Sequence, residues 1–125
     1  MTVHILTIPG NPPITANQSR AWTWPKVRKH IAAIRAQAAW IARQQHLPTL
    51  GPSEVAFTWY CDNRRHDVDS ITTFGKACID GLVDAGVWAD DNPNYITAIH
   101  LYHAYDKHEP RVEVRITPAT VQVPA

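Results

Sequence analysis

Four segments of the chain carry the residue pattern of β-strands. Residues 3–8, 54–61 and 95–105 are rich in β-branched or aromatic side chains, and residues 111–116 alternate between polar and apolar positions. In the last segment the apolar side chains share one face, because successive residues of a strand point to opposite sides. These patterns predict four strands with about these boundaries.

Two longer segments have the three- and four-residue apolar spacing of amphipathic helices. The first, residues 24–46, follows Thr23, a residue type that caps helices, and has Pro25 in its first turn. The second covers residues 70–85 and is expected to end at Gly86. The apolar stripes are Val27, Ile31, Ile34, Ala38 and Ile41 in the first helix, and Ile71, Phe74, Cys78, Leu82 and Ala85 in the second.

Residues 9–19 are predicted to form a loop, because the three prolines there disfavour both a helix and a central strand. The predicted element order is therefore β-α-β-α-β-β. This order favours an α+β fold of two layers, in which a mixed sheet of about four strands has two helices on one face. We expect one domain over residues 1–118 and a short tail over residues 119–125.

Composition narrows the classes of protein to consider. The 125 residues are 45% hydrophobic and 18% charged, as in a globular domain. No apolar run approaches the roughly 18 residues that span a membrane, and the first residues do not resemble a signal peptide. Cys61 and Cys78 have no companion ligands for zinc and are expected to be reduced and buried. We therefore expect a cytoplasmic protein without a membrane partner.

Charge is unevenly distributed, although the formal net charge is only +1. Residues 1–53 contain six basic residues and no acidic ones, whereas residues 54–125 hold the other six basic residues and all eleven acids. Polarity of this kind often marks a surface for a polyanion such as nucleic acid, although a basic helix face can also serve solubility alone. The candidate DNA-contacting residues are Arg20, Lys26, Arg28, Lys29, Arg35, Arg64 and Arg65.

The aromatic residues and histidines give weaker evidence about function. Trp22 and Trp24 lie beside basic residues and could stack on unpaired bases, or belong to the core or to a dimer contact. His66 and His103 are scattered and read more simply as incidental than as ligands.

The acids concentrate in residues 67–91, which contain six aspartates and one lysine. On a helical wheel Asp69, Lys76 and Asp80 fall on the face opposite the apolar stripe. The simple interpretation is a solvated helix, with Asp69 favouring the helix N-terminus and Lys76 pairing weakly with Asp80. The functional alternative is a lysine directed at a phosphoryl group.

A cation site is the second interpretation of these acids. Asp67 and Asp69 point the same way if their segment is extended, and two such carboxylates can share one hard cation. Mg²⁺ prefers one or two carboxylates together with water and phosphate oxygens. Asp90 and Asp91 could join this site only if the fold returns their loop to it.

The ordered set RRHDVDS, Lys76 and CIDGLVDAGVWADD resembles the RusA family of Holliday junction resolvases from bacteria and their phages. That family has a basic run leading into D-x-D-N, then a lysine and an aspartate on a helix, then A-G and a terminal D-D pair. PGNPPITANQSRAW is similar to the family's Pro-Pro-x-x-x-Asn loop, with Asn17 at the asparagine. The likeness covers roughly residues 3–117.

The resemblance implies a homodimeric endonuclease that uses Mg²⁺, with Mn²⁺ as a substitute, to nick branched DNA such as four-way junctions in recombination and repair. Asp67, Asp69 and Asp91 resemble the metal ligands of the family. The implied chemistry is hydrolysis of a phosphodiester by metal-activated water. A two-fold dimer would cut two opposed strands, in a bacterial or phage-infected cell.

Three further residues carry roles by the same resemblance. Lys76 resembles the catalytic lysine, Asp90 stands beside the third essential acid, and Asp80 matches a helix acid. Ser70 departs from the family, because it replaces the Asn after D-x-D and loses any amide contact, although serine can still cap a helix.

Lys76 also departs from some members in its spacing, because it lies seven residues after Asp69. Seven residues are about two helical turns, which keeps the lysine on the carboxylate face. The departures leave two alternatives: a metal nuclease that acts on flaps or forks, and a non-catalytic protein that binds branched DNA and kept the fold.

Overall fold

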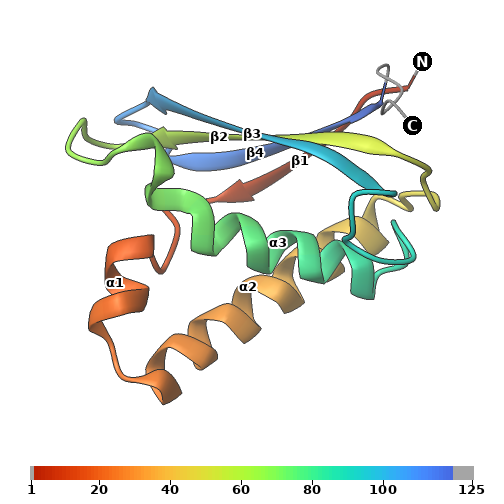
Figure 1. Ribbon diagram of the computed structural model, residues 1–125. Helices are drawn as coiled ribbons and strands as arrows, with labels where there is room; N and C mark the ends of the chain where they lie inside the picture. The colour runs from red at the N-terminus through yellow and green to blue at the C-terminus, as the bar shows by residue number, and fades with distance from the viewer. Residues whose placement is uncertain (1, 120–125) are drawn as a thin grey trace.

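The computed structural model describes residues 2–119 and confirms the predicted α+β class. Four strands form one mixed sheet in the order β1-β4-β2-β3, and the helices lie on one side of it (Figure 1). Strand β4 pairs antiparallel with β1 and β2, while β2 pairs parallel with β3. The strands are β1 (His4–Pro9), β2 (Ser53–Cys61), β3 (Ile96–Tyr105) and β4 (Arg111–Pro118), with ends within two residues of the predicted ones.

The parallel pairing of β2 with β3 requires a crossover connection, and this crossover carries the acidic segment. It contains a short 3₁₀-helix, η1 (Val68–Ile71), followed by α3 (Thr72–Asp84). The aspartates at 67 and 69 therefore follow the carboxyl end of β2. Asp90 and Asp91 follow the other end of α3, just before β3 begins.

The first long helix, α2 (Trp24–Gln44), ends two residues before its predicted end at 46. Thr23 occupies its N-cap position as predicted, although its side chain makes no capping hydrogen bond. Helix α3 ends as predicted just before Gly86, whose φ of 83° is the left-handed conformation that glycine adopts at helix ends.

The predicted loop over residues 9–19 is wrong at its end, because α1 (Ala16–Ala21) begins there. Thr15 and Gln18 form a capping box: each side chain accepts a hydrogen bond from the other residue's backbone N–H, at 3.3 and 3.0 Å. The hydroxyls of Ser19 and Thr73 lie 3.1 Å apart, which ties α1 to α3. Figure 1 shows α1 beside the start of α3.

Two expectations at the start of the second helix are also wrong. The segment from Asp67 to Asp69 is not extended throughout, because η1 begins at Val68. Ser70 is no cap of α3 but lies within η1, where its hydroxyl donates to the Asp67 carbonyl oxygen at 2.6 Å. The tight 3₁₀ turn satisfies the serine locally.

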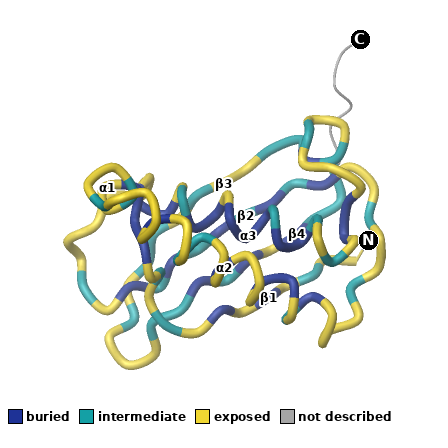
Figure 2. Tube along the Cα trace, turned by 90° about the horizontal axis from the view of Figure 1, so that it is seen from below, coloured by how far each residue is buried: buried dark blue, intermediate teal, exposed yellow. Residues whose placement is uncertain are grey.

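The core lies between the sheet and helices α2 and α3, and buried and half-buried positions alternate along β2 (Figure 2). Cys61 and Cys78 are free and fully buried, as expected, and burial raises the pKa of the Cys78 thiol. Of the tryptophans, Trp59 and Trp88 are buried, whereas Trp24 and Trp40 are largely exposed. The largest buried side chains are Trp59, Trp88, Phe57, Phe74, Leu6, Ile14, Ile34, Ile71, Leu82, Ile116, Val55 and Val87.

Helices α2 and α3 cross closely at Gly81. A Cβ atom there would overlap the Arg35 carbonyl oxygen and would lie 3.0 Å from the Ala38 side chain. Arg35 adds a polar tie, because its guanidinium donates two hydrogen bonds to the Asp84 carboxylate, one of them 2.7 Å long. No helix within residues 2–119 is both long and apolar enough to cross a membrane.

Candidate active site

A polar pocket of about 140 Å³ lies between α1 and the start of the crossover. Asp67 and Asp69 line it from one side, together with Arg65. Asn17 and Arg20 line it from α1, where the Arg20 guanidinium donates a 3.2 Å hydrogen bond to the Asn17 side chain. The fold therefore brings Asn17 and both aspartates, Asp67 and Asp69, to one pocket.

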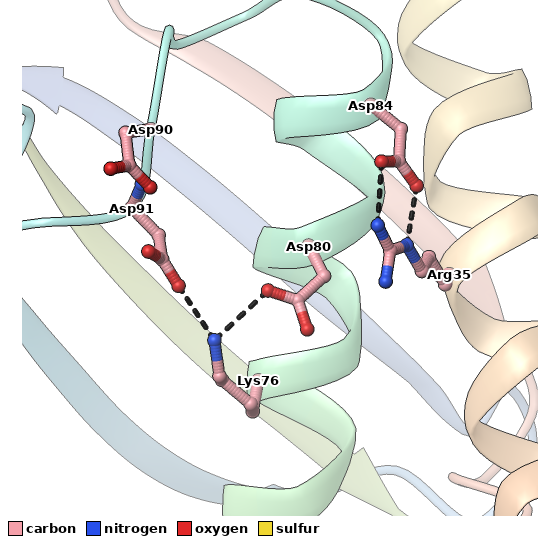
Figure 3. Close-up of polar contacts among 6 residues, drawn as sticks. All are labelled: Arg35, Lys76, Asp80, Asp84, Asp90 and Asp91. Atoms are coloured by element: carbon pink, nitrogen blue, oxygen red, sulfur yellow. Dashed lines mark hydrogen bonds and ion pairs between the residues drawn. The ribbon is translucent and has the colours of Figure 1, made fainter.

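The remaining carboxylates gather farther along α3, around the ammonium group of Lys76 (Figure 3). Lys76 Nζ donates to Asp80 Oδ1 at 2.9 Å and to Asp91 Oδ2 at 2.6 Å. The loop after α3 thus folds back along the helix and brings Asp91 beside Lys76 rather than beside Asp69. The hydrogen bond from Lys76 lowers the pKa of Asp91, and the carboxylates of Asp91 and Asp80 raise the pKa of Lys76.

Replacing Lys76 with glutamine should raise the pKa of Asp91 toward the ordinary aspartate value. A lowered pKa in the folded state adds stability above the ordinary pKa, and this stability is lost as pH falls through the lowered value. The Lys76 side chain is 63% exposed, so the effect on overall stability should be small. The measurement is a carboxyl ¹³C NMR titration of wild type and Lys76→Gln, with Arg115→Gln as control. An Asp91 pKa equal in all three proteins would refute the coupling.

Asp90 has a local structural task. Its carboxylate accepts the Asp91 backbone N–H at 2.7 Å and the Asn92 side-chain amide at 3.1 Å. These bonds close the turn before β3 and hold Asp91 toward α3. The geometry gives Asp90 a positioning role beside the one that the resemblance implies.

The structure supports a Mg²⁺ site made by Asp67 and Asp69 better than one made by Asp67, Asp69 and Asp91 together. Two exposed carboxylates on one polar pocket match an ion that takes one or two carboxylates and keeps several waters. Within residues 2–119, however, no three His, Cys, Asp or Glu side chains lie close enough to share one metal ion. Asp91 as a third ligand therefore rests on the family resemblance alone.

The candidate DNA-contacting residues divide into three groups. Arg20 lies on α1, and Lys26, Arg28 and Lys29 lie on the first turns of α2, where Lys26 Nζ sits 4.0 Å from the Trp22 ring centre. Arg64 and Arg65 follow β2, and the Arg64 guanidinium lies 4.6 Å from the Tyr105 ring centre. Figure 1 shows α1, the start of α2 and the β2–α3 connection at the same end of the molecule.

Arg35 stands apart from this basic end. It is hydrogen-bonded to Asp84 (Figure 3). The guanidinium lowers the pKa of the Asp84 carboxyl group, and the carboxylate raises the pKa of the Arg35 guanidinium. The structure thus gives Arg35 a place in the α2–α3 contact rather than among the cations that surround α1.

Sequence reasoning missed α1, the short helix that forms one side of the polar pocket and is held in place by Thr15 and Ser19. The available signal was the spacing of Thr15 and Gln18, which is that of a capping box. The prolines just before it favour a loop and obscure this signal.

The comparisons with known proteins identify the family of the chain. The family model described as Endodeoxyribonuclease RusA matches residues 7–117, which include both the polar pocket and the Lys76 cluster. A search of curated proteins found no significant match. Because the family model covers most of the chain, the chain belongs to the RusA family of endodeoxyribonucleases, which act on Holliday junctions.

Proposed function

We propose that the protein resolves four-way DNA junctions by Mg²⁺-dependent hydrolysis of two phosphodiester bonds. The observation that carries this proposal is the pocket between α1 and η1, where two carboxylates and two arginines meet in a chain of the RusA family. Asp67 and Asp69 would hold the ion, with Asp91 as the third ligand by resemblance to the family. A bound Mg²⁺ would polarise the phosphate and lower the pKa of a coordinated water.

Lys76 has a distinct role in this proposal. An ammonium group has three N–H donors, and two of them are directed at Asp80 and Asp91. The third is left for a phosphate oxygen, where a positive charge stabilises the negative charge that develops during hydrolysis. The two carboxylates hold the ammonium in place and favour its charged form.

A homodimer is the second part of the proposal, because a four-way junction has approximate two-fold symmetry and two opposed strands must be cut. Its support is the outer edge of β3, which ends the sheet and contains no Lys, Pro, Asp or Glu. Ile99 and Tyr102 on this strand are 53% and 54% exposed. Edge strands without such protective residues readily pair with a second chain. We propose the β3 edge as the contact between two copies.

The substrate is tested with a panel of labelled DNAs: a four-way junction, a flap, a fork and a linear duplex, each with Mg²⁺. We expect the junction to be cut fastest, at paired positions in two opposed strands. Faster cutting of the flap or fork would show that the protein is a metal nuclease with a different substrate. Junction binding that persists in EDTA, without cutting in Mg²⁺, would show that the protein binds branched DNA but is not an enzyme. Single unpaired nicks would contradict the dimer.

A further inference from the structure

Trp59, a buried tryptophan near the end of β2, is held in place from two other parts of the chain. Its side chain is 1% exposed. The indole N–H donates a 3.1 Å hydrogen bond to the side-chain oxygen of Asn11, in the loop that leads to α1. His103, which lies opposite it in the pairing of β2 with β3, packs against the indole at a steep angle, with ring centres 5.2 Å apart. The indole is therefore a fixed surface for a further side chain.

His66, which directly precedes Asp67, packs on this surface. Its imidazole ring centre lies 4.8 Å from that of the Trp59 indole, and the two ring planes are inclined by 40°. Aromatic pairs prefer such offset or tilted arrangements at ring-centre distances of roughly 4.5–7 Å. His66 also lines the polar pocket together with Asp67 and Asp69. This contact therefore joins the core of the domain to the backbone that carries the two candidate metal ligands.

The connection that carries His66 is an irregular segment. Residues 62–67 lie between β2 and η1 and belong to neither a helix nor a strand. Asn63 donates to the Asp62 side chain at 3.0 Å and accepts the Arg65 backbone N–H at 2.9 Å, so these hydrogen bonds close a turn within the segment itself. Regions with few buried contacts open locally at low free-energy cost. The contact of His66 with a buried side chain opposes that opening.

A role for His66 as a metal ligand has less support. Within residues 2–119, no three His, Cys, Asp or Glu side chains lie close enough to share one metal ion. His66 therefore does not complete a three-residue site with Asp67 and Asp69. Its ring is engaged by Trp59 instead, so packing is the role that the geometry supports.

We propose that His66 and Trp59 are positioning residues, which hold the backbone of Asp67 and Asp69 in the conformation that binds the metal ion. The inference rests on the proposed function, because it explains how the carboxylates of that site are kept in place. Its particular content is that the aromatic ring of residue 66 is needed and the ring nitrogens are not. Carboxylates that are ordered before binding hold an ion more tightly, because less conformational entropy is lost when it binds.

The test compares His66→Ala with His66→Phe. Phenylalanine keeps an aromatic ring to pack on Trp59, but it has no nitrogen that could bind a metal ion, a phosphate or a proton. The first measurement is the backbone ¹⁵N NMR order parameter of Asp67 and Asp69 in the metal-free protein. In His66→Ala it should fall from the ordered range of about 0.85 toward about 0.6, and in His66→Phe it should stay near the wild-type value.

The second measurement is the Mg²⁺ concentration that gives half-maximal cleavage of a four-way junction. It should rise roughly three- to tenfold in His66→Ala, which is the range expected for the loss of one aromatic pair. In His66→Phe it should stay within about twofold of the wild type. The control is His46→Asn, which removes an exposed histidine just beyond the other end of α2. Asparagine tolerates the φ of 53° at this position, so this variant should match the wild type in both measurements.

Two results would overturn the inference. Order parameters that are unchanged in His66→Ala would show that the ring does not hold the segment. Equal losses in His66→Ala and His66→Phe would show that the imidazole nitrogens are required.

The inference and the proposed function can fail separately. A wild type that cuts junctions, with the same Mg²⁺ requirement in His66→Ala, would refute the positioning role and leave the nuclease. A wild type that cuts no DNA, in which Asp67 and Asp69 lose order in His66→Ala but not in His66→Phe, would refute the nuclease. The ring of His66 would then still be the group that orders this segment.

Discussion

Asp69→Asn should reduce junction cleavage in Mg²⁺ at least about 10³-fold. A bound metal ion contributes several kcal/mol of transition-state stabilisation, and each 1.36 kcal/mol is a factor of ten in rate. The amide keeps the size of the side chain but removes the negative charge on the pocket. EDTA should abolish wild-type cleavage to the same extent. The measurement is the single-turnover rate on a labelled four-way junction.

The matched control for this prediction is Asp84→Asn. Asp84 is also exposed and lies on α3, but it faces Arg35 of α2 and does not line the pocket. Its rate should stay within about twofold of the wild type, because only an exposed ion pair between helices is lost. If the Asp69→Asn protein is folded and cuts at the wild-type rate, Asp69 is not a ligand of the metal ion.

Gly81→Ala should lower the free energy of unfolding by about 2 kcal/mol. Overpacking a well-packed contact costs roughly 1–3 kcal/mol, and here the new methyl group would meet the Arg35 carbonyl oxygen, a backbone atom that cannot rotate away. The better helix propensity of alanine offsets only about 1 kcal/mol. Thermal and urea unfolding followed by circular dichroism would measure the loss.

Gly75→Ala tests whether the effect belongs to the helix crossing. Gly75 lies on the same helix, but its added Cβ would be 3.4 Å from the Phe57 ring, an ordinary packing distance. Its stability should be unchanged or increase by up to about 1 kcal/mol. Equal destabilisation by both substitutions would show that the loss in Gly81→Ala is not caused by the close approach of α2 and α3.

The periodic parts of the fold follow from the sequence. The apolar alternation of 111–116 and the stripe on 70–85 are set by how strands and helices repeat, so both elements are confirmed. Helix α1 is only six residues long and is held by one capping box and its contact with Thr73 on α3. Short helices depend on tertiary contacts more than on local pattern, so the sequence alone predicts a loop here.

The candidate site could be predicted only where its residues share one element. The wheel placed Lys76 and Asp80 on one face, and the structure joins them. The position of Asp91 depends on the loop before β3, which no local pattern specifies, and it lies beside Lys76. The charge of Arg35 alone suggests contact with DNA, because the sequence does not show that Asp84 lies opposite it.

The most direct measurement is cleavage of a four-way junction by the wild-type protein, with each of the four strands labelled in turn. We expect Mg²⁺-dependent nicks at symmetric positions in two opposed strands, and none in EDTA. A junction that is bound but left intact in Mg²⁺, or is cut equally well in EDTA, would contradict metal-dependent resolution.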